Sequence, residues 1–171
     1  MNIKRVVVGN LQTNCYILEK DNECLIIDPG DEFEKIKNNI SKNVVGVLLT
    51  HRHFDHIGAL EELVEFYKVD VHDKSNLKEG NHIINDFEFE VFYNPGHTDD
   101  SISFIFNNVM FSGDFIFLGT IGRWDLGGNI TDMKNSIIKI LNSKINYKIY
   151  PGHGDLTYLI DERKMLEYYL K

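Results

Sequence analysis

The chain has 171 residues, of which 43% are hydrophobic and 26% charged, and its formal net charge is −8. We expect a single domain over residues 1–171, because a chain of this length buries a core without a structural metal or disulfides. No apolar run approaches the ~18–20 residues of a membrane span, and an acidic chain with scattered lysines and arginines is not expected to bind nucleic acid. The N-terminal stretch lacks the apolar core of a signal peptide, so we expect a cytoplasmic protein.

The first half of the chain alternates β-rich runs with helical patterns. The predicted strands cover residues 3–9, 13–19, 23–30 and 44–50. Residues 31–40 have helical spacing, and apolar residues recur on one helical face between Ile57 and Tyr67. The segment between the strand ending at residue 50 and this second helix is therefore a strand-end loop, where α/β proteins place their chemistry.

The second half repeats the alternation. The predicted strands cover residues 87–94, 101–107, 109–114 and 147–152. We expect one helix to begin at Thr131 as its N-cap and a closing helix to begin at Asp161. The pattern indicates an α/β fold, and we favour two mixed β-sheets face to face with helices on both outer faces.

Four potential metal ligands lie within six residues of the segment "THRHFDH": His51, His53, Asp55 and His56. In a shuffled chain of this composition such a motif would occur roughly once in a thousand tries. Imidazole and carboxylate together suit zinc, with iron and manganese as alternatives. Because one open catalytic ion rarely takes four ligands from one segment, the motif predicts two divalent ions.

Three further candidate ligands each follow a predicted strand and a glycine. They are His97 in "NPGHTDD", Asp114 in "FSGDFIF" and His153 in "YPGHGDL". Glycine before each ligand indicates a sharp turn or a close backbone approach. Five of the seven histidines therefore belong to candidate ligand loops.

Four other residues are expected to play no part in the site. His72 and His82 lie outside every ligand loop and are expected on the surface or in strands. Cys15 and Cys24 lie in apolar, strand-like surroundings without CxxC spacing, so we expect both to be reduced core residues.

The motifs "THRHFDH", "GHT", "SGD" and "PGHG", in this order, resemble the metallo-β-lactamase superfamily, and the resemblance runs from "NLQTNCYIL" to "PGHG". It implies a four-layer αβ/βα sandwich. It also implies one metal on His51, His53 and His97 and a second on Asp55, His56 and His153. Asp114 would bridge the two ions.

The segment "SGDFIFLGTIGRWDLGG" is similar to a segment of glyoxalase II-like hydrolases and of persulfide dioxygenases. Glyoxalase II has an extra helical domain after "PGHG", whereas this chain has one expected helix there, as in short single-domain relatives. The resemblance implies a dinuclear hydrolase of a small thioester, with Asp55 and Asp114 as catalytic carboxylates. The alternative is a mononuclear iron persulfide dioxygenase using His51, His97 and Asp114.

Arg123 and Trp124 in "GRWDLGG" are the expected substrate-binding residues. Arg123 can bind a substrate carboxylate or pair with Asp125 to hold its loop. Trp124 stands where the family tends to have a small hydroxyl residue, so it either narrows the pocket or packs against the loop. Asp99 and Asp100 follow "GHT" and add negative charge beside the site.

Overall fold

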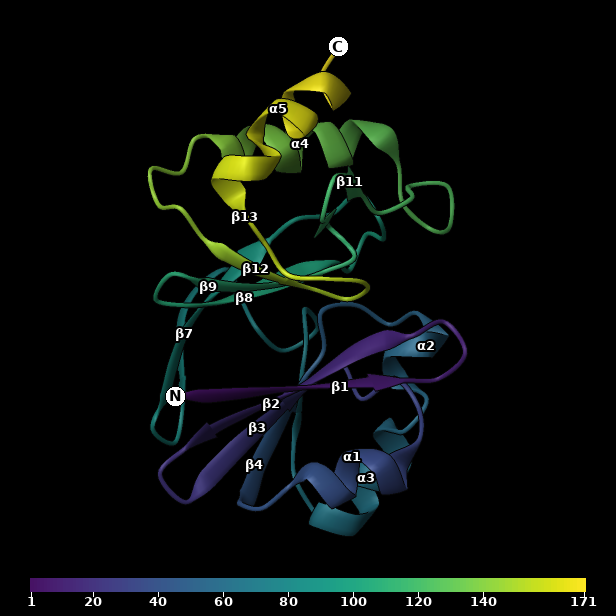
Figure 1. Ribbon diagram of the computed structural model, residues 1–171, viewed down its shortest axis with the longest axis vertical. Helices are drawn as coiled ribbons and strands as arrows, with labels where there is room; N and C mark the ends of the chain where they lie inside the picture. The colour runs from purple at the N-terminus through teal and green to yellow at the C-terminus, as the bar shows by residue number, and fades with distance from the viewer.

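The computed structural model describes residues 1–171 as two β-sheets stacked face to face, each covered by helices on its outer side (Figure 1). The lower sheet in the figure comes from the first half of the chain and the upper sheet from the second half. This α/β/β/α layering confirms the predicted fold class.

The first sheet has the strand order β1-β2-β3-β4-β5. Its strands are β1 (Asn2–Val8), β2 (Thr13–Lys20), β3 (Glu23–Ile27), β4 (Asn43–Leu48) and β5 (Val71–His72). Strands β1 to β3 are antiparallel, whereas β3, β4 and β5 run parallel, so the sheet is mixed. Helices α1 (Phe33–Asn39) and α3 (Leu60–Tyr67) cover its outer face, and the short α2 (Phe54–Ile57) lies at its edge (Figure 1).

The second sheet has the order β13-β12-β9-β8-β7-β6. Its strands are β6 (Gly80–Ile84), β7 (Phe87–Tyr93), β8 (Ile102–Phe106), β9 (Val109–Gly113), β12 (Lys148–Pro151) and β13 (Thr157–Tyr158). Only β9 and β12 pair in parallel. Helices α4 (Ile130–Leu141) and α5 (Leu159–Tyr169) cover this sheet, and a separate hairpin is formed by β10 (Ile116–Phe117) and β11 (Thr120–Ile121).

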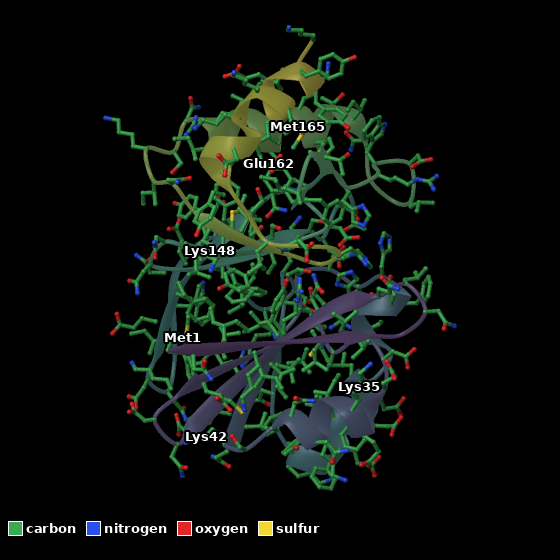
Figure 2. The ribbon with its side chains drawn as sticks, in the orientation of Figure 1. Met1, Lys35, Lys42, Lys148, Glu162 and Met165 are labelled. Atoms are coloured by element: carbon green, nitrogen blue, oxygen red, sulfur yellow. The ribbon has the colours of Figure 1, made fainter.

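Three hydrophobic clusters fill the spaces between the four layers. The central cluster joins residues of the first sheet, such as Tyr16 and Leu25, to aromatic residues of the second, such as Phe104 and Phe111. Two further clusters fill the spaces between each sheet and its helices. Side chains occupy the space between the ribbons throughout (Figure 2). None of the helices is both long enough and apolar enough to cross a membrane.

Two predicted helix starts were wrong. Helix α4 is capped by Asn129, whose side chain accepts a hydrogen bond from the Asp132 amide at 2.8 Å, so Thr131 lies inside the helix. Helix α5 begins at Leu159, two residues before Asp161, and directly follows β13. The start of α4 still follows capping preference, since asparagine is a favoured N-cap, whereas α5 has Tyr158 as its N-cap, without a side-chain cap.

The predicted helix between Ile57 and Tyr67 is interrupted. It divides into α2 and α3 near Gly58, whose amide donates to the Gly30 carbonyl at 2.9 Å. A Cβ at residue 58 would lie 2.3 Å from that carbonyl oxygen, so glycine is required for this approach.

The residues expected to play no part in the site lie where they were expected. His72 is in β5 and His82 is in β6, and neither belongs to a ligand cluster. Cys15 and Cys24 are buried free thiols in the cluster between the first sheet and its helices.

Candidate metal centre

The predicted ligand loops meet at one edge of the two stacked sheets. His51 follows β4, and His97 lies between β7 and β8. Asp114 and His153 follow β9 and β12, whose parallel pairing places Gly113 opposite Pro151. Neighbouring parallel strands end side by side, so their loops reach the same point. The fold thereby brings all seven predicted ligands together.

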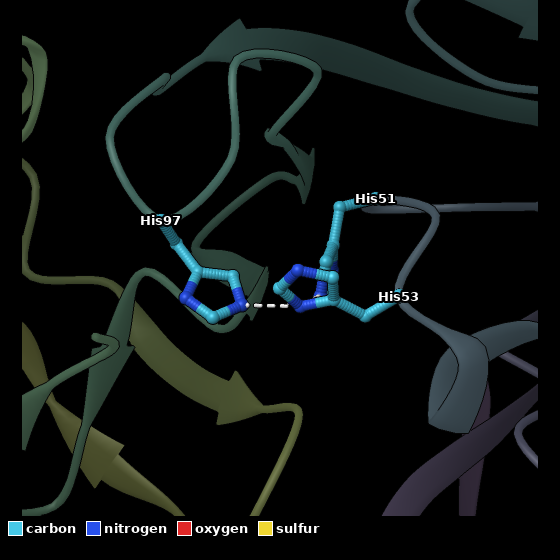
Figure 3. Close-up of side chains that lie close together, drawn as sticks. All are labelled: His51, His53 and His97. Carbon is cyan, nitrogen blue, oxygen red and sulfur yellow. Dashed lines mark hydrogen bonds between the residues drawn. The ribbon is translucent and has the colours of Figure 1, made fainter. Parts of the chain in front are cut away.

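His51, His53 and His97 form the first group of ligands (Figure 3). Nδ1 of His53 lies 2.8 Å from Nε2 of His97 and 3.2 Å from Nε2 of His51. The rings point toward one another from two separate loops, as the close-up shows. Three convergent imidazole nitrogens are a suitable ligand set for one divalent transition metal.

Asp55, His56 and His153 form the second group. Oδ2 of Asp55 lies 3.2 Å from Nε2 of His153 and 3.7 Å from Nε2 of His56. The hydroxyl of Thr13 donates to the same Asp55 oxygen at 2.9 Å and fixes the carboxylate. The second group supplies the mixed nitrogen and oxygen ligands that zinc and iron accept.

Asp114 lies between the two groups. Its Oδ2 is 3.4 Å from Nε2 of His97 in the first group and 3.5 Å from Nε2 of His153 in the second. Its Oδ1 is 3.3 Å from Nε2 of His56. The carboxylate therefore faces both groups at once, and the histidine and aspartate clusters are consistent with a dinuclear metal site.

Two buried polar atoms at the centre lack the hydrogen-bond partners that buried polar atoms normally have. Nε2 of His56 and Oδ1 of Asp114 are fully buried and have no hydrogen-bond partner. Buried polar groups without partners are rare, and each requires an explanation such as an ion. Both atoms point to the space shared by the ligands, so the residues present fit bound metal.

Every ligand histidine has one ring nitrogen held by an acceptor outside the ligand set. The acceptor fixes the ring tautomer and leaves the other nitrogen facing the centre. The pairs are His51 Nδ1 with Thr50 Oγ1 (3.1 Å), His53 Nε2 with the Leu126 carbonyl (2.9 Å), His56 Nδ1 with Asp28 Oδ2 (3.0 Å), His97 Nδ1 with the Arg123 carbonyl and His153 Nδ1 with the Leu11 carbonyl (3.1 Å).

These acceptors were missed by sequence reasoning. Asp28 in "IIDPG" gave a partial signal, because a carboxylate after a buried strand needs partners. The carbonyls of Leu11, Arg123 and Leu126 gave none, because every residue has a backbone carbonyl.

Carboxylates at the centre favour positive charge on two of the candidate ligand histidines. Burial lowers the pKa of His56, but the carboxylates of Asp28 and Asp114 outweigh burial and raise it to about 10. Burial also lowers the pKa of His153, and its hydrogen bonds with Asp114 and Asp55 raise it to about 9. By contrast, burial holds the pKa of His51 well below its usual value.

Both site carboxylates are held ionised. Burial raises the pKa of Asp55, but the hydrogen bond with His153 and the charge of His56 lower it below its usual value. The pKa of Asp114 is likewise lowered, since the neighbouring imidazoles of His153 and His56 outweigh burial. In the metal-free protein, protons on two imidazoles therefore balance charge that a metal would balance.

The two predicted substrate-binding residues lie on the loop after β11. The exposed guanidinium of Arg123 donates to both oxygens of Asp125, at 2.9 and 2.7 Å, which is the loop-holding alternative. The half-buried Trp124 packs edge-on against Tyr169 of α5, with ring centroids 6.3 Å apart. A contact of either side chain with substrate stays a prediction.

The chain is similar to curated proteins that are named as hydrolases. It is 34% identical to the "Probable metallo-hydrolase YqgX" of Bacillus subtilis, over 95% of both chains. It is 30% identical to the "Hydroxyacylglutathione hydrolase GloC" of Haemophilus influenzae, over 96% of both chains.

Solved structures share the fold. The BLEG-1 B3 metallo-beta-lactamase superposes with a TM-score of 0.90 at 30% identity, over 99% of this chain and all of that one. TTHA1623 in a di-iron-bound form superposes with a TM-score of 0.82 at 30% identity, over 93% of this chain and 96% of that one.

The model of the Metallo-beta-lactamase superfamily matches residues 8–74 and 65–153, which together include all seven predicted ligands. The match agrees with the fold and with the histidine- and aspartate-rich centre of a metallo-hydrolase. The chain belongs to the metallo-β-lactamase superfamily.

Proposed function

We propose that the protein is a dinuclear metal-dependent hydrolase that cleaves a small thioester. The observation that carries the proposal is the position of Asp114, whose Oδ2 lies within 3.5 Å of a histidine nitrogen from each ligand group. A carboxylate in this position can hold two ions close together, as two-metal hydrolases require. Zinc is the metal we propose, with iron and manganese as alternatives.

Each ligand group would hold one ion, and Asp114 would bridge them. Ions held by these residues would supply an activated water at neutral pH and would polarise the acyl carbonyl. Asp55 and Asp114 are the carboxylates of the centre, so they are placed to accept hydrogen bonds from the attacking water and to orient it. A thiolate, with a free pKa near ~8.5, leaves with little help from an acid.

The comparisons support parts of this proposal. The hydroxyacylglutathione hydrolase of Haemophilus influenzae, 30% identical to this chain, is named for a thioester substrate. The solved di-iron form of TTHA1623 supports two ions in this fold at 30% identity. The two buried free cysteines suit a reducing compartment, and on that ground we propose that the enzyme is cytoplasmic.

Metal analysis joined to two activity assays tests the proposal. The purified protein would be assayed for hydrolysis of acyl thioesters of glutathione, coenzyme A and an uncharged thiol, and for oxygen uptake with glutathione persulfide. We expect about two metal equivalents and thioester hydrolysis without oxygen uptake. One iron per chain with oxygen consumption would instead establish the persulfide dioxygenase alternative.

The Asp114→Ala variant tests the bridging role. We expect it to keep its circular dichroism spectrum and to lose metal, because neither ligand group retains the shared carboxylate. A variant that binds both ions as tightly as the unchanged protein would contradict the bridging role.

A further inference from the structure

Four apolar residues lie next to candidate ligands, in the chain or by contact, and we name them the apolar rim: Leu11, Phe54, Phe117 and Leu126. They come from four separate segments: the β1–β2 loop, α2, β10 and the loop after β11. Leu11, Phe54 and Leu126 are exposed over 54%, 75% and 51% of their surface. Large apolar side chains gathered around a polar site indicate a ligand-binding surface.

Two of the contacts that orient the candidate ligand histidines also hold the backbone of rim residues in place. The Leu11 carbonyl accepts from His153, and the Leu126 carbonyl accepts from His53. The Phe117 ring lies 6.0 Å from the His153 ring, edge-on. Phe54 stands between two ligands in the chain. Two of the rim residues, Leu11 and Phe54, line a cleft together with Asp55 of the second ligand group.

A cleft of about 200 Å³ opens beside Asp55. It lies between the β1–β2 loop and α2, and its apolar lining is Val8, Leu11 and Phe54. Since Asp55 belongs to the second ligand group and also lines this cleft, an apolar group attached to a reacting carbonyl can enter it.

The arginines near the site are already paired with carboxylates. Arg123 pairs with Asp125, Arg52 with Asp73 and Arg5 with Asp155. The whole chain has a net charge of −8. A substrate carrying carboxylates or phosphates would therefore compete with existing partners and approach a surface of its own sign.

We propose that the apolar rim selects thioesters with an apolar acyl group and an uncharged thiol portion, a proposal that rests on the proposed hydrolase function. Anionic thiol portions, such as those of glutathione and coenzyme A, are disfavoured by the paired arginines.

The experiment compares one acyl group on two thiols. Metal-loaded protein is assayed with the hexanoyl thioesters of N-acetylcysteamine, which is uncharged, and of glutathione. We expect kcat/KM to be at least about tenfold higher for the uncharged thioester, with the difference shrinking at high salt. Calorimetry with the corresponding S-hexyl thioethers, which cannot be hydrolysed, measures whether the protein also binds the uncharged compound more tightly than the glutathione compound.

The rim is tested with Phe54→Ala, and Phe66→Ala is the matched control. Phe66 is also exposed but lies on α3, where it packs against Phe33. We expect Phe54→Ala to lower kcat/KM for the hexanoyl thioester about tenfold, since apolar contact area is lost. The acetyl thioester, which cannot reach the cleft, should be affected much less, and Phe66→Ala should leave both unchanged.

The outcomes separate this inference from the proposed function. Equal or better use of the glutathione thioester, with equal thioether binding, would overturn the inference and leave the hydrolase intact. If neither thioester is hydrolysed, the proposed function fails. In that case the thioethers still decide the inference: selective binding of the uncharged thioether supports it, and equal or absent binding overturns it.

Discussion

Oδ2 of Asp28 lies 3.0 Å from Nδ1 of His56, although 28 residues separate them in the chain. The same oxygen accepts from the Thr50 hydroxyl at 2.6 Å, and Oδ1 accepts from the Thr50 amide at 2.8 Å. One buried carboxylate at the end of β3 thus fixes the end of β4 and a ligand ring of the second group. Asp28 has a φ of 50°, a left-handed conformation that aspartate tolerates better than most residues.

Replacement of Asp28 by asparagine should weaken binding of the second ion. With its oxygen on the Thr50 amide, the asparagine would turn its NH₂ toward Nδ1 of His56, and the ring proton would move to Nε2. Nε2 is the atom that faces the ions, so we expect an affinity loss of about 10–100-fold at the second group. Titration against a chromophoric chelator measures it.

Asp21→Asn is the matched control for this variant. Asp21 also has a left-handed φ, 52°, but is exposed and lies in the turn between β2 and β3. It should leave both metal affinities unchanged. Unaltered affinity in Asp28→Asn would show that the Asp28 carboxylate does not orient His56.

Gly152→Ala should disturb the metal centre directly. A Cβ at this position would lie 2.3 Å from Oδ1 of Asp114 and 2.7 Å from Cε1 of His56. Both are ligand side chains, so we expect metal content to fall along with thermal stability. The comparison is Gly154→Ala, where a Cβ meets open space but φ is +74°.

Backbone strain in Gly154→Ala should lower the free energy of unfolding by about 1–2 kcal/mol. The variant should retain its metal. Elemental analysis of both variants measures the metal content, which only crowding of the ligands by Gly152→Ala should lower. Thermal denaturation measures the loss of stability, which both variants should show. Full metal retention in Gly152→Ala would contradict the positions assigned to Asp114 and His56.

Metal binding should release protons at pH 7. In the metal-free protein the pKa values of His56 and His153 are raised to about 10 and about 9, so both rings carry a proton. An ion at the second group must displace them, and we expect the release of about two protons. Calorimetry in two buffers of different ionisation enthalpy measures the number, which should decrease in His153→Gln and stay constant in His82→Gln.

The same shifts set the pH dependence of the metal-free protein. A raised folded-state pKa contributes stability that is fully present below the unfolded value near 6.5 and is lost as pH rises through about 9 and 10. The free energy of unfolding should therefore fall across this range, while metal affinity rises. Denaturant titrations of chelator-treated protein test the first part, and a flat profile would refute it.

Glu162→Ala should loosen the β10–β11 hairpin. The buried Glu162 of α5 accepts from the Gly119 amide at 2.9 Å and from the Thr157 hydroxyl at 2.6 Å. Loss of the carboxylate leaves the buried Thr157 hydroxyl without its acceptor, at a cost of about 1–3 kcal/mol, and also removes the acceptor of the exposed Gly119 amide. Figure 2 shows Glu162 on the helix that covers this region.

Glu162→Gln should restore much of this stability, because one oxygen can still accept from the amide while the hydroxyl reverses its role. Glu167→Ala, at an exposed position of the same helix, is the control and should change little. Thermal denaturation compares the three variants. Equal stability of Glu162→Ala and Glu167→Ala would be the contrary result.

Several features of the fold were predictable because they depend on local patterns. The predicted strand over residues 44–50 has no charged residue and is apolar up to Leu49, as expected for a strand buried on both faces, and most of it forms β4, which ends at Leu48. Short strands such as β5 and β13, with two residues each, were missed, because two residues carry no periodicity. The break at Gly58 was also missed, since its cause is a carbonyl 28 residues earlier in the chain.

The sequence by itself determined the types of the candidate ligands and their strand-end positions, because metal chemistry requires particular side chains and the motif fixes their spacing. Only the tertiary structure decided which nitrogen of each histidine faces the centre. That choice depends on acceptors such as the Leu11 and Leu126 carbonyls, which lie far from their histidines in the chain. A backbone carbonyl is present at every residue, so its role becomes specific only when folding brings it beside a ring.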